Sequence, residues 1–233
     1  MRVGLLVCDH VRDELLPIAG DYPDMFAALF GGAVELCSYD VVSGELPASV
    51  AECDAWITTG SAASVYDPEP WIRRLGSFVV DVIGAQRPFV GICFGMQLMA
   101  QALGGEVAKA PQGWQVGVSH VTWTGPRPPW ASPIPTDLKL LSSHRDQVVA
   151  LPTRAEVLAG SPHCPVAVIA VGDHAIGFQG HPEFTAPYVA ALCEGRRDRI
   201  GGDVVDIAIR SLDEATDASA VAAAIMAFID APG

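Results

Sequence analysis

The sequence is poor in positive charge. Its 233 residues include 14 lysines and arginines but 27 aspartates and glutamates, which gives a formal net charge of −13. A chain this acidic repels phosphate backbones and anionic lipid surfaces. The composition therefore predicts that neither nucleic acid nor a membrane surface is a partner.

Long apolar runs and paired cysteines are also missing from the sequence. No run approaches the ~20 apolar residues needed to cross a bilayer, and the N-terminus reads as a short apolar strand rather than a signal peptide. The six cysteines are scattered, with no C-x-x-C pair and no histidine at a spacing that suits zinc. We therefore expect a reduced, cytoplasmic protein without a structural metal or a cofactor.

Apolar runs of strand length alternate with helical patterns in the first part of the chain. Half of the residues are hydrophobic, enough for a sizeable core in one domain. The alternation predicts a parallel sheet covered by helices. Strands are expected at residues 3–7, 33–37, 55–59 and 89–93, and helices at residues 22–30 and 70–83.

The pattern changes after residue 105 to short β-rich segments broken by glycine and proline. This change predicts a mixed or antiparallel continuation of the same domain, and the proline-rich residues 126–135 predict an irregular surface loop. After Phe184 the pattern is helical. The expected β-segments are 116–123, 138–141, 157–159, 166–171 and 175–179, and the expected helices are 186–197, 204–211 and 218–229.

A buried strand followed at once by a helix carries the most informative motif, Gly91-Ile92-Cys93-Phe94-Gly95. The two glycines allow a tight turn that pushes a nucleophile out of the chain in a strained conformation. The unpaired N–H groups at the helix N-terminus favour the thiolate of Cys93, and the N–H of Phe94 is placed to hold a developing oxyanion. The alternative is a buried cysteine at a strand end.

A thiol nucleophile needs a base, and the base needs a group that orients it. His181-Pro182-Glu183 supplies both, since residues i and i+2 of an extended segment point the same way. Glu183 can then hold the imidazole of His181 in the required tautomer. Taken alone, this tripeptide could equally form a turn.

The segments 91–97 and 180–183, in this order and at this distance, closely resemble the class I glutamine amidotransferases, and most nearly the amidotransferase domain of GMP synthases and its stand-alone relatives. The resemblance spans roughly residues 1–185. It implies a flavodoxin-like three-layer α/β fold with a central, mostly parallel sheet, an extra β-hairpin region and C-terminal helices. It also implies a Cys-His-Glu triad, Cys93, His181 and Glu183, that attacks a γ-glutamyl amide, releases ammonia or an amine, and hydrolyses the thioester.

Further positions match the family pattern. The segment 58–66 resembles the family's oxyanion loop, but Ser61 stands in place of its second glycine, so either Gly60 or Ser61 could supply the N–H. Gln97 matches the residue that hydrogen-bonds the substrate. His144 and Asp146, in a segment that resembles Ser-His-x-Asp-x-Val, are further substrate-binding candidates, with a structural role equally open.

Three functions follow from the resemblance. The first is a self-contained hydrolase or peptidase for a γ-glutamyl amide or glutamine, and the second is a glutaminase subunit that feeds ammonia to a synthetase partner. The tail, residues 186–233, resembles the helical extension packed on the domain in stand-alone members and favours the first. The third is a non-catalytic binding module, disfavoured because all three triad residues are present.

The tail also carries a charged cluster, residues 194–199, with three arginines among its six residues. Its simplest interpretation is a solvated helix end. The alternative is that it binds an anionic group.

Overall fold

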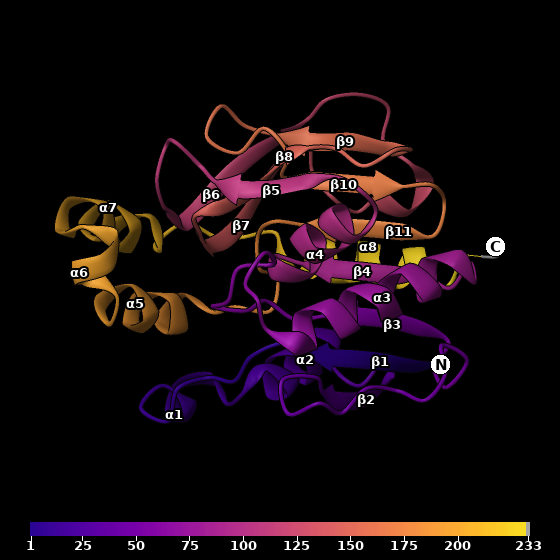
Figure 1. Cartoon of the computed structure of the whole chain (residues 1–233). Coiled ribbons are helices and arrows are strands. Elements are labelled where there is room, and N and C mark those ends of the chain that lie inside the picture. The colour runs from indigo at the N-terminus through magenta and orange to yellow at the C-terminus, as the bar shows by residue number, and fades with distance from the viewer. Residues whose placement is uncertain (232–233) are drawn as a thin grey trace.

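A nine-stranded sheet organises the chain in the computed structural model, which describes residues 1–231. The strand order is β2-β1-β3-β4-β11-β10-β9-β6-β7, and the first five are parallel (Figure 1). The remaining neighbours are antiparallel. The strands are β1 (Arg2–Val7), β2 (Glu35–Asp40), β3 (Ala55–Thr58), β4 (Phe89–Ile92), β6 (Gln115–Trp123), β7 (Asp137–His144), β9 (Ala155–Gly160), β10 (Val168–Val171) and β11 (Ala175–Phe178).

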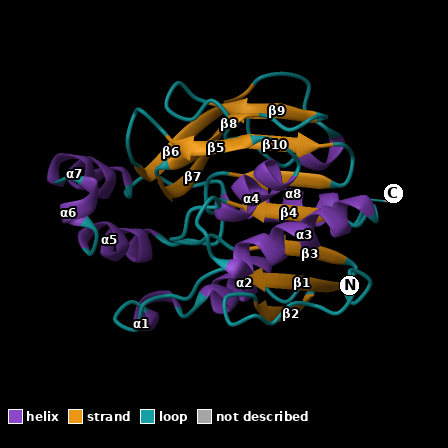
Figure 2. Cartoon of the chain, in the orientation of Figure 1, coloured by secondary structure: helices purple, strands orange, loops and turns teal. Residues whose placement is uncertain are grey.

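Helices cover both faces of the parallel strands, which makes the three layers predicted from the sequence (Figure 2). Because side chains alternate along a strand, Leu5 joins one core and Leu6 the other. The first core includes residues of α2 (Tyr22–Phe30) and α8 (Ala218–Ile229), and the second includes residues of α3 (Pro70–Gly84) and α4 (Phe94–Ala102).

The antiparallel strands curl back toward the middle of the sheet. An antiparallel bridge joins Leu141 of β7 to His181, which follows β11, and the His181 N–H donates to the Leu141 carbonyl at 2.7 Å. A second, two-stranded sheet pairs β5 (Glu106–Lys109) with β8 (Asp146–Ala150). The curl brings the end of β7 beside the end of β11.

The C-terminal segment differs from the expected helix at residues 186–197. It forms α5 (Ala186–Glu194) and α6 (Arg197–Ile200), because the backbone leaves helical geometry at Arg196. Figure 1 shows α5, α6 and α7 (Gly202–Ser211) beyond the end of the sheet at which β4 turns into α4. None of the helices in residues 1–231 is long and apolar enough to span a bilayer.

Other boundaries moved for local reasons. The strand expected at residues 33–37 begins later, at Glu35, because Gly31 and Gly32 have positive φ and Ala33 still bonds back to Phe30. The short helix α1 (Leu16–Ala19) and the strands β5 and β8 were not predicted, since segments of four or five residues carry little periodicity. The proline-rich loop contains one short 3₁₀ helix, Pro129–Ala131.

Candidate active site

Cys93 sits in a strained backbone conformation between β4 and α4. Its φ is 50° and its ψ is −100°, outside the regions that residues with a side chain favour. A Cβ on Gly91 would lie 2.5 Å from the Met96 backbone nitrogen, and one on Gly95 would overlap the Thr58 hydroxyl. Both neighbouring glycines are therefore required for this tight turn, as the motif predicts.

The His181 imidazole is held on three sides. Its Nδ1 lies 2.7 Å from Glu183 Oε1, and both side chains are buried. The Phe184 ring stacks on it at a centroid distance of 3.8 Å, and a Cβ on Gly60 would lie only 2.7 Å from its Cε1. The ring therefore has little freedom to rotate.

Two neighbours favour the charged form of His181. Burial by itself lowers the pKa of His181, but the Glu183 carboxylate and Cys93 raise it, and the net shift is upward. The arrangement therefore brings a thiol, an imidazole that readily keeps its proton, and a carboxylate together in one buried cluster.

A chain of hydrogen-bonded side-chain amides ends at the Cys93 thiol. Gln179 Nε2 donates to Cys93 Sγ at 3.4 Å, and Gln179 Oε1 accepts from Gln97 Nε2 at 3.1 Å. The Gln97 Nε2 also donates to the Asp146 backbone carbonyl at 2.7 Å. Since Gln97 uses its amide nitrogen inside the protein, its carbonyl oxygen is the atom left for a substrate.

Asp146 ties two loops together. Its Oδ2 accepts hydrogen bonds from Ser64 Oγ at 2.6 Å and from Tyr66 OH at 3.0 Å. Asp9 Oδ2 accepts from the Ala62 N–H at 2.7 Å. The loop after β3 is thus held by side chains at two points, although it lacks the second glycine of the family pattern.

A pocket of about 340 Å³ opens over Cys93. Its lining includes Ser61, Gln97 and Asp146, and also Trp114 and Arg196. The volume lies in the range of small-molecule sites. Among residues 1–231, no group of three or more His, Cys, Asp or Glu side chains is arranged to hold a metal ion.

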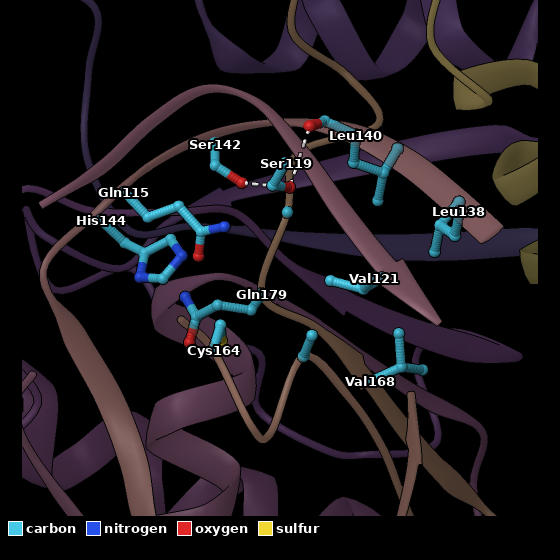
Figure 3. Close-up of a pocket in the computed structure, with 12 residues that line it drawn as sticks. Gln115, Ser119, Val121, Leu138, Leu140, Ser142, His144, Cys164, Val168 and Gln179 are labelled. Atoms are coloured by element: carbon cyan, nitrogen blue, oxygen red, sulfur yellow. Dashed lines mark hydrogen bonds between the residues drawn. The ribbon is translucent and has the colours of Figure 1, made fainter. Parts of the chain in front are cut away.

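A smaller cavity lies among residues of β6, β7 and the segment after β11, and it shares His144 with the pocket over Cys93. Its volume is about 10 Å³, which is room for about one water molecule. Figure 3 shows polar side chains at one end, where His144 lies near Gln115 and Gln179, and apolar side chains at the other. Burial lowers the pKa of His144 to about 3, and the nearby His181 adds to this effect, so His144 is neutral at pH 7.

The comparisons with known proteins agree on one family. The sequence matches Glutamine amidotransferase class-I over residues 39–187. The chain belongs to the class I glutamine amidotransferase family. This finding confirms the resemblance stated from the sequence.

The relatives of this amidotransferase include a γ-glutamyl peptidase and a glutamine-hydrolyzing synthase. It is 31% identical to gamma-glutamyl peptidase 5 of Arabidopsis thaliana over 172 residues, which is 71% of this chain and 68% of the relative. It is 42% identical to the glutamine-hydrolyzing GMP synthase of Thermomicrobium roseum over 127 residues, but that match covers 54% of this chain and only 23% of the synthase.

The fold agrees with solved amidotransferases. The crystal structure of a glutamine amidotransferase from Thermotoga maritima superposes with a TM-score of 0.78 at 20% identity, covering 98% of this chain and 99% of that one. At this identity the likeness concerns the fold alone. It confirms the predicted flavodoxin-like α/β class.

The amidotransferase structure brings the predicted site residues together around the pocket. Cys93, Ser61, Gln97, His144 and Asp146 line it directly. The other predicted residues lie around it: Gly60 against His181, Phe94 at the first position of α4, and His181 and Glu183 in the buried cluster beside Cys93. The roles of these residues remain predictions.

Sequence reasoning missed Gln179 and Asp9. Neither stands in a motif, and each acts over a long sequence separation, 86 residues from Gln179 to Cys93 and 53 from Asp9 to Ala62. The only signal in the sequence was that Gln179 stands two residues before His181 in an extended segment, where residues i and i+2 share a side. The positions of Arg196 and Arg199 on the pocket wall support the less favoured interpretation of the charged cluster.

Proposed function

We propose that this class I amidotransferase is a thiol hydrolase that cleaves γ-glutamyl amides by itself, with Cys93 as the nucleophile. The observation that carries the proposal is the strained turn at Cys93, close to a His181 ring that Glu183 and Phe184 hold in place. A cysteine with φ of 50° is costly and persists where the geometry is needed.

The reaction proceeds through a thioester. The Cys93 thiolate attacks the side-chain carbonyl carbon of the γ-glutamyl group, and the new oxyanion is held by the N–H of Phe94 and by an N–H of Gly60 or Ser61. The His181 imidazolium gives its proton to the leaving nitrogen, so that ammonia or an amine departs. His181 then takes a proton from the water that attacks the thioester, and the intermediate collapses to release glutamate and the Cys93 thiolate, which restores the starting thiolate and imidazolium.

Glu183 and Gln179 act through their neighbours. Glu183 fixes the His181 ring with its Nε2 toward the reacting atoms, because Nδ1 is bonded to the carboxylate. Gln179 steadies the thiol through its 3.4 Å hydrogen bond. Gln97 presents its carbonyl oxygen to the ammonium group of the substrate.

A second function is an ammonia-supplying subunit for a synthetase partner. The match to GMP synthase favours it, because the name of that relative combines glutamine hydrolysis with a synthase. We rank it second because the match to the γ-glutamyl peptidase covers more of both chains.

Amine release by the purified chain tests both. We expect the chain to cleave a γ-glutamyl amide without any partner, and the Cys93→Ser variant to be inactive. A folded chain that releases neither ammonia nor amine from glutamine, γ-glutamyl peptides or γ-glutamyl amides would contradict the hydrolase.

A further inference from the structure

The pocket over Cys93 is positively charged, although the chain as a whole has a net charge of −13. Four of the chain's 14 basic residues line this pocket, against two carboxylates. The nearby His144 is neutral, since burial lowers its pKa to about 3. The basic residues are Lys109, Arg145, Arg196 and Arg199, and the acidic residues are Asp67 and Asp146.

The four basic groups are not neutralised by the protein. Within residues 1–231, none of them lies within 4.0 Å of a carboxylate. Arg197, which lies between Arg196 and Arg199 in the sequence, is different: it pairs with Glu194 at 2.6 Å and with Asp206 at 2.8 Å. Arg197 is therefore paired within the tail, whereas Arg196 and Arg199 line the pocket without a carboxylate partner.

The two tail arginines are held in place by uncharged groups. Arg196 Nη1 donates to Ser143 Oγ at 3.3 Å, and the Arg199 guanidinium lies 5.0 Å from the centre of the Trp114 ring. Such contacts orient a guanidinium and leave its charge and most of its N–H donors free. Both residues lie beyond the part of the chain that matches the family, residues 39–187.

The excess of two positive charges is larger than a glutamyl group needs. The ammonium and carboxylate of its α-carbon sum to zero charge, so one anionic and one cationic wall group satisfy them. Asp146 and either Arg145 or Lys109 can do so. Asp67 offsets the other of Arg145 and Lys109, so the charges of Arg196 and Arg199 remain without a counter-charge.

We infer that Arg196 and Arg199 bind a carboxylate on the amine half of the substrate, so that the enzyme selects γ-glutamyl peptides over glutamine and over neutral γ-glutamyl amides. The inference rests on the proposed hydrolase and adds its substrate class. Ammonia from glutamine carries no group that could reach these arginines, whereas an amino acid amine carries its carboxylate away from the scissile bond. Guanidinium groups suit this task, since they bind carboxylates through paired N–H donors.

The test compares two substrates that differ in one charge. γ-Glutamylglycine ends in a carboxylate, and γ-glutamylglycinamide ends in a neutral amide of nearly the same size. We expect the wild-type kcat/KM to be about tenfold higher for γ-glutamylglycine, because charge-assisted hydrogen bonds are roughly twice as strong as neutral ones. Added salt should reduce this preference, since both arginines are solvent-accessible.

The double variant Arg196→Gln, Arg199→Gln assigns the preference to these residues. It should lose about tenfold in kcat/KM on γ-glutamylglycine, mainly through KM, and stay within about twofold of wild type on γ-glutamylglycinamide. Arg210→Gln is the matched control, because Arg210 is exposed on α7 and does not line the pocket. It should behave as wild type on both substrates.

The outcomes separate the inference from the proposed function. Equal wild-type rates on the two substrates, or an equal loss on both in the double variant, would overturn the inference and leave the hydrolase standing. If the wild type cleaved neither substrate, calorimetric binding of both compounds to Cys93→Ala would still test the inference. Tighter binding of γ-glutamylglycine would support the role of the arginines, and equal binding would refute it. Thermal melts of each variant confirm that it is folded.

Discussion

Replacing Cys93 by glycine should give a more stable chain than replacing it by alanine, and both variants should be inactive. Cys93 has φ of 50° and ψ of −100°, a conformation that glycine adopts without steric cost. A residue held in such a sparsely populated region costs of order 1–3 kcal/mol. The strain arises from the Cβ atom, so removing the thiol alone does not release it.

The comparison with Cys93→Ala isolates the Cβ. Alanine keeps the Cβ and loses the sulfur, so both variants lack the nucleophile and the contacts of the thiol. At an ordinary position glycine is less stable than alanine by roughly 0.5–1 kcal/mol, because it loses more backbone entropy on folding. After that loss is subtracted, the middle of the two ranges makes Cys93→Gly more stable than Cys93→Ala by about 1 kcal/mol.

Urea unfolding of the two variants at one pH measures the difference, with equal m-values as the check that both unfold in the same way. In a chain of this size each kcal/mol corresponds to roughly 2–4 °C in melting temperature. A Cys93→Gly variant that is equally stable or less stable than Cys93→Ala would refute the strain at this turn.

Three further predictions concern the groups around the nucleophile. Glu183→Gln should lower kcat by about 10²-fold or more with the fold intact, because the His181 ring loses the charge that orients it and raises its pKa; unchanged steady-state kinetics would contradict this role. Gln179→Leu should lower kcat about tenfold, because it removes the hydrogen bond to Cys93, and it should change the pH profile of kcat/KM; a uniform rise in KM alone would indicate substrate binding instead. His144→Asn should flatten the pH dependence of stability. The pKa of His144 is about 3 in the folded chain and 6.5 ordinarily, so the unfolded chain takes up the proton first as the pH falls. Wild-type stability therefore falls as the pH drops below 6.5, by up to about 1.4 kcal/mol per pH unit. Urea unfolding between pH 4.5 and 7 measures this slope, which would be equal in both proteins if His144 were not buried and neutral.

Local signals explain what the sequence predicted well. The helices at residues 22–30 and 218–229 have the predicted bounds, and the first begins at a capping box formed by Asp21 and Asp24. The turn at Cys93 was predictable because only glycine fits at Gly91 and Gly95. The residues that determine its geometry are therefore its close neighbours in the sequence.

Features that depend on distant contacts were not predictable. The return of β7 to His181, the amide chain through Gln179 and the position of α6 each join segments far apart in the sequence. No short window of residues encodes them. They follow from how the sheet curls, which is decided by packing over the whole domain.

The bridge between Leu141 and His181 makes the geometry of the active site depend on correct folding of the whole domain. The nucleophile follows β4, whereas the base, which follows β11, is bridged to β7, the last strand in the sheet order. A folding intermediate in which β7 has not yet paired with the segment after β11 would carry the thiol, but its base would not yet be fixed in position. During refolding, enzymatic turnover should therefore recover later than the helical circular dichroism signal. A partly folded chain would not hydrolyse substrate.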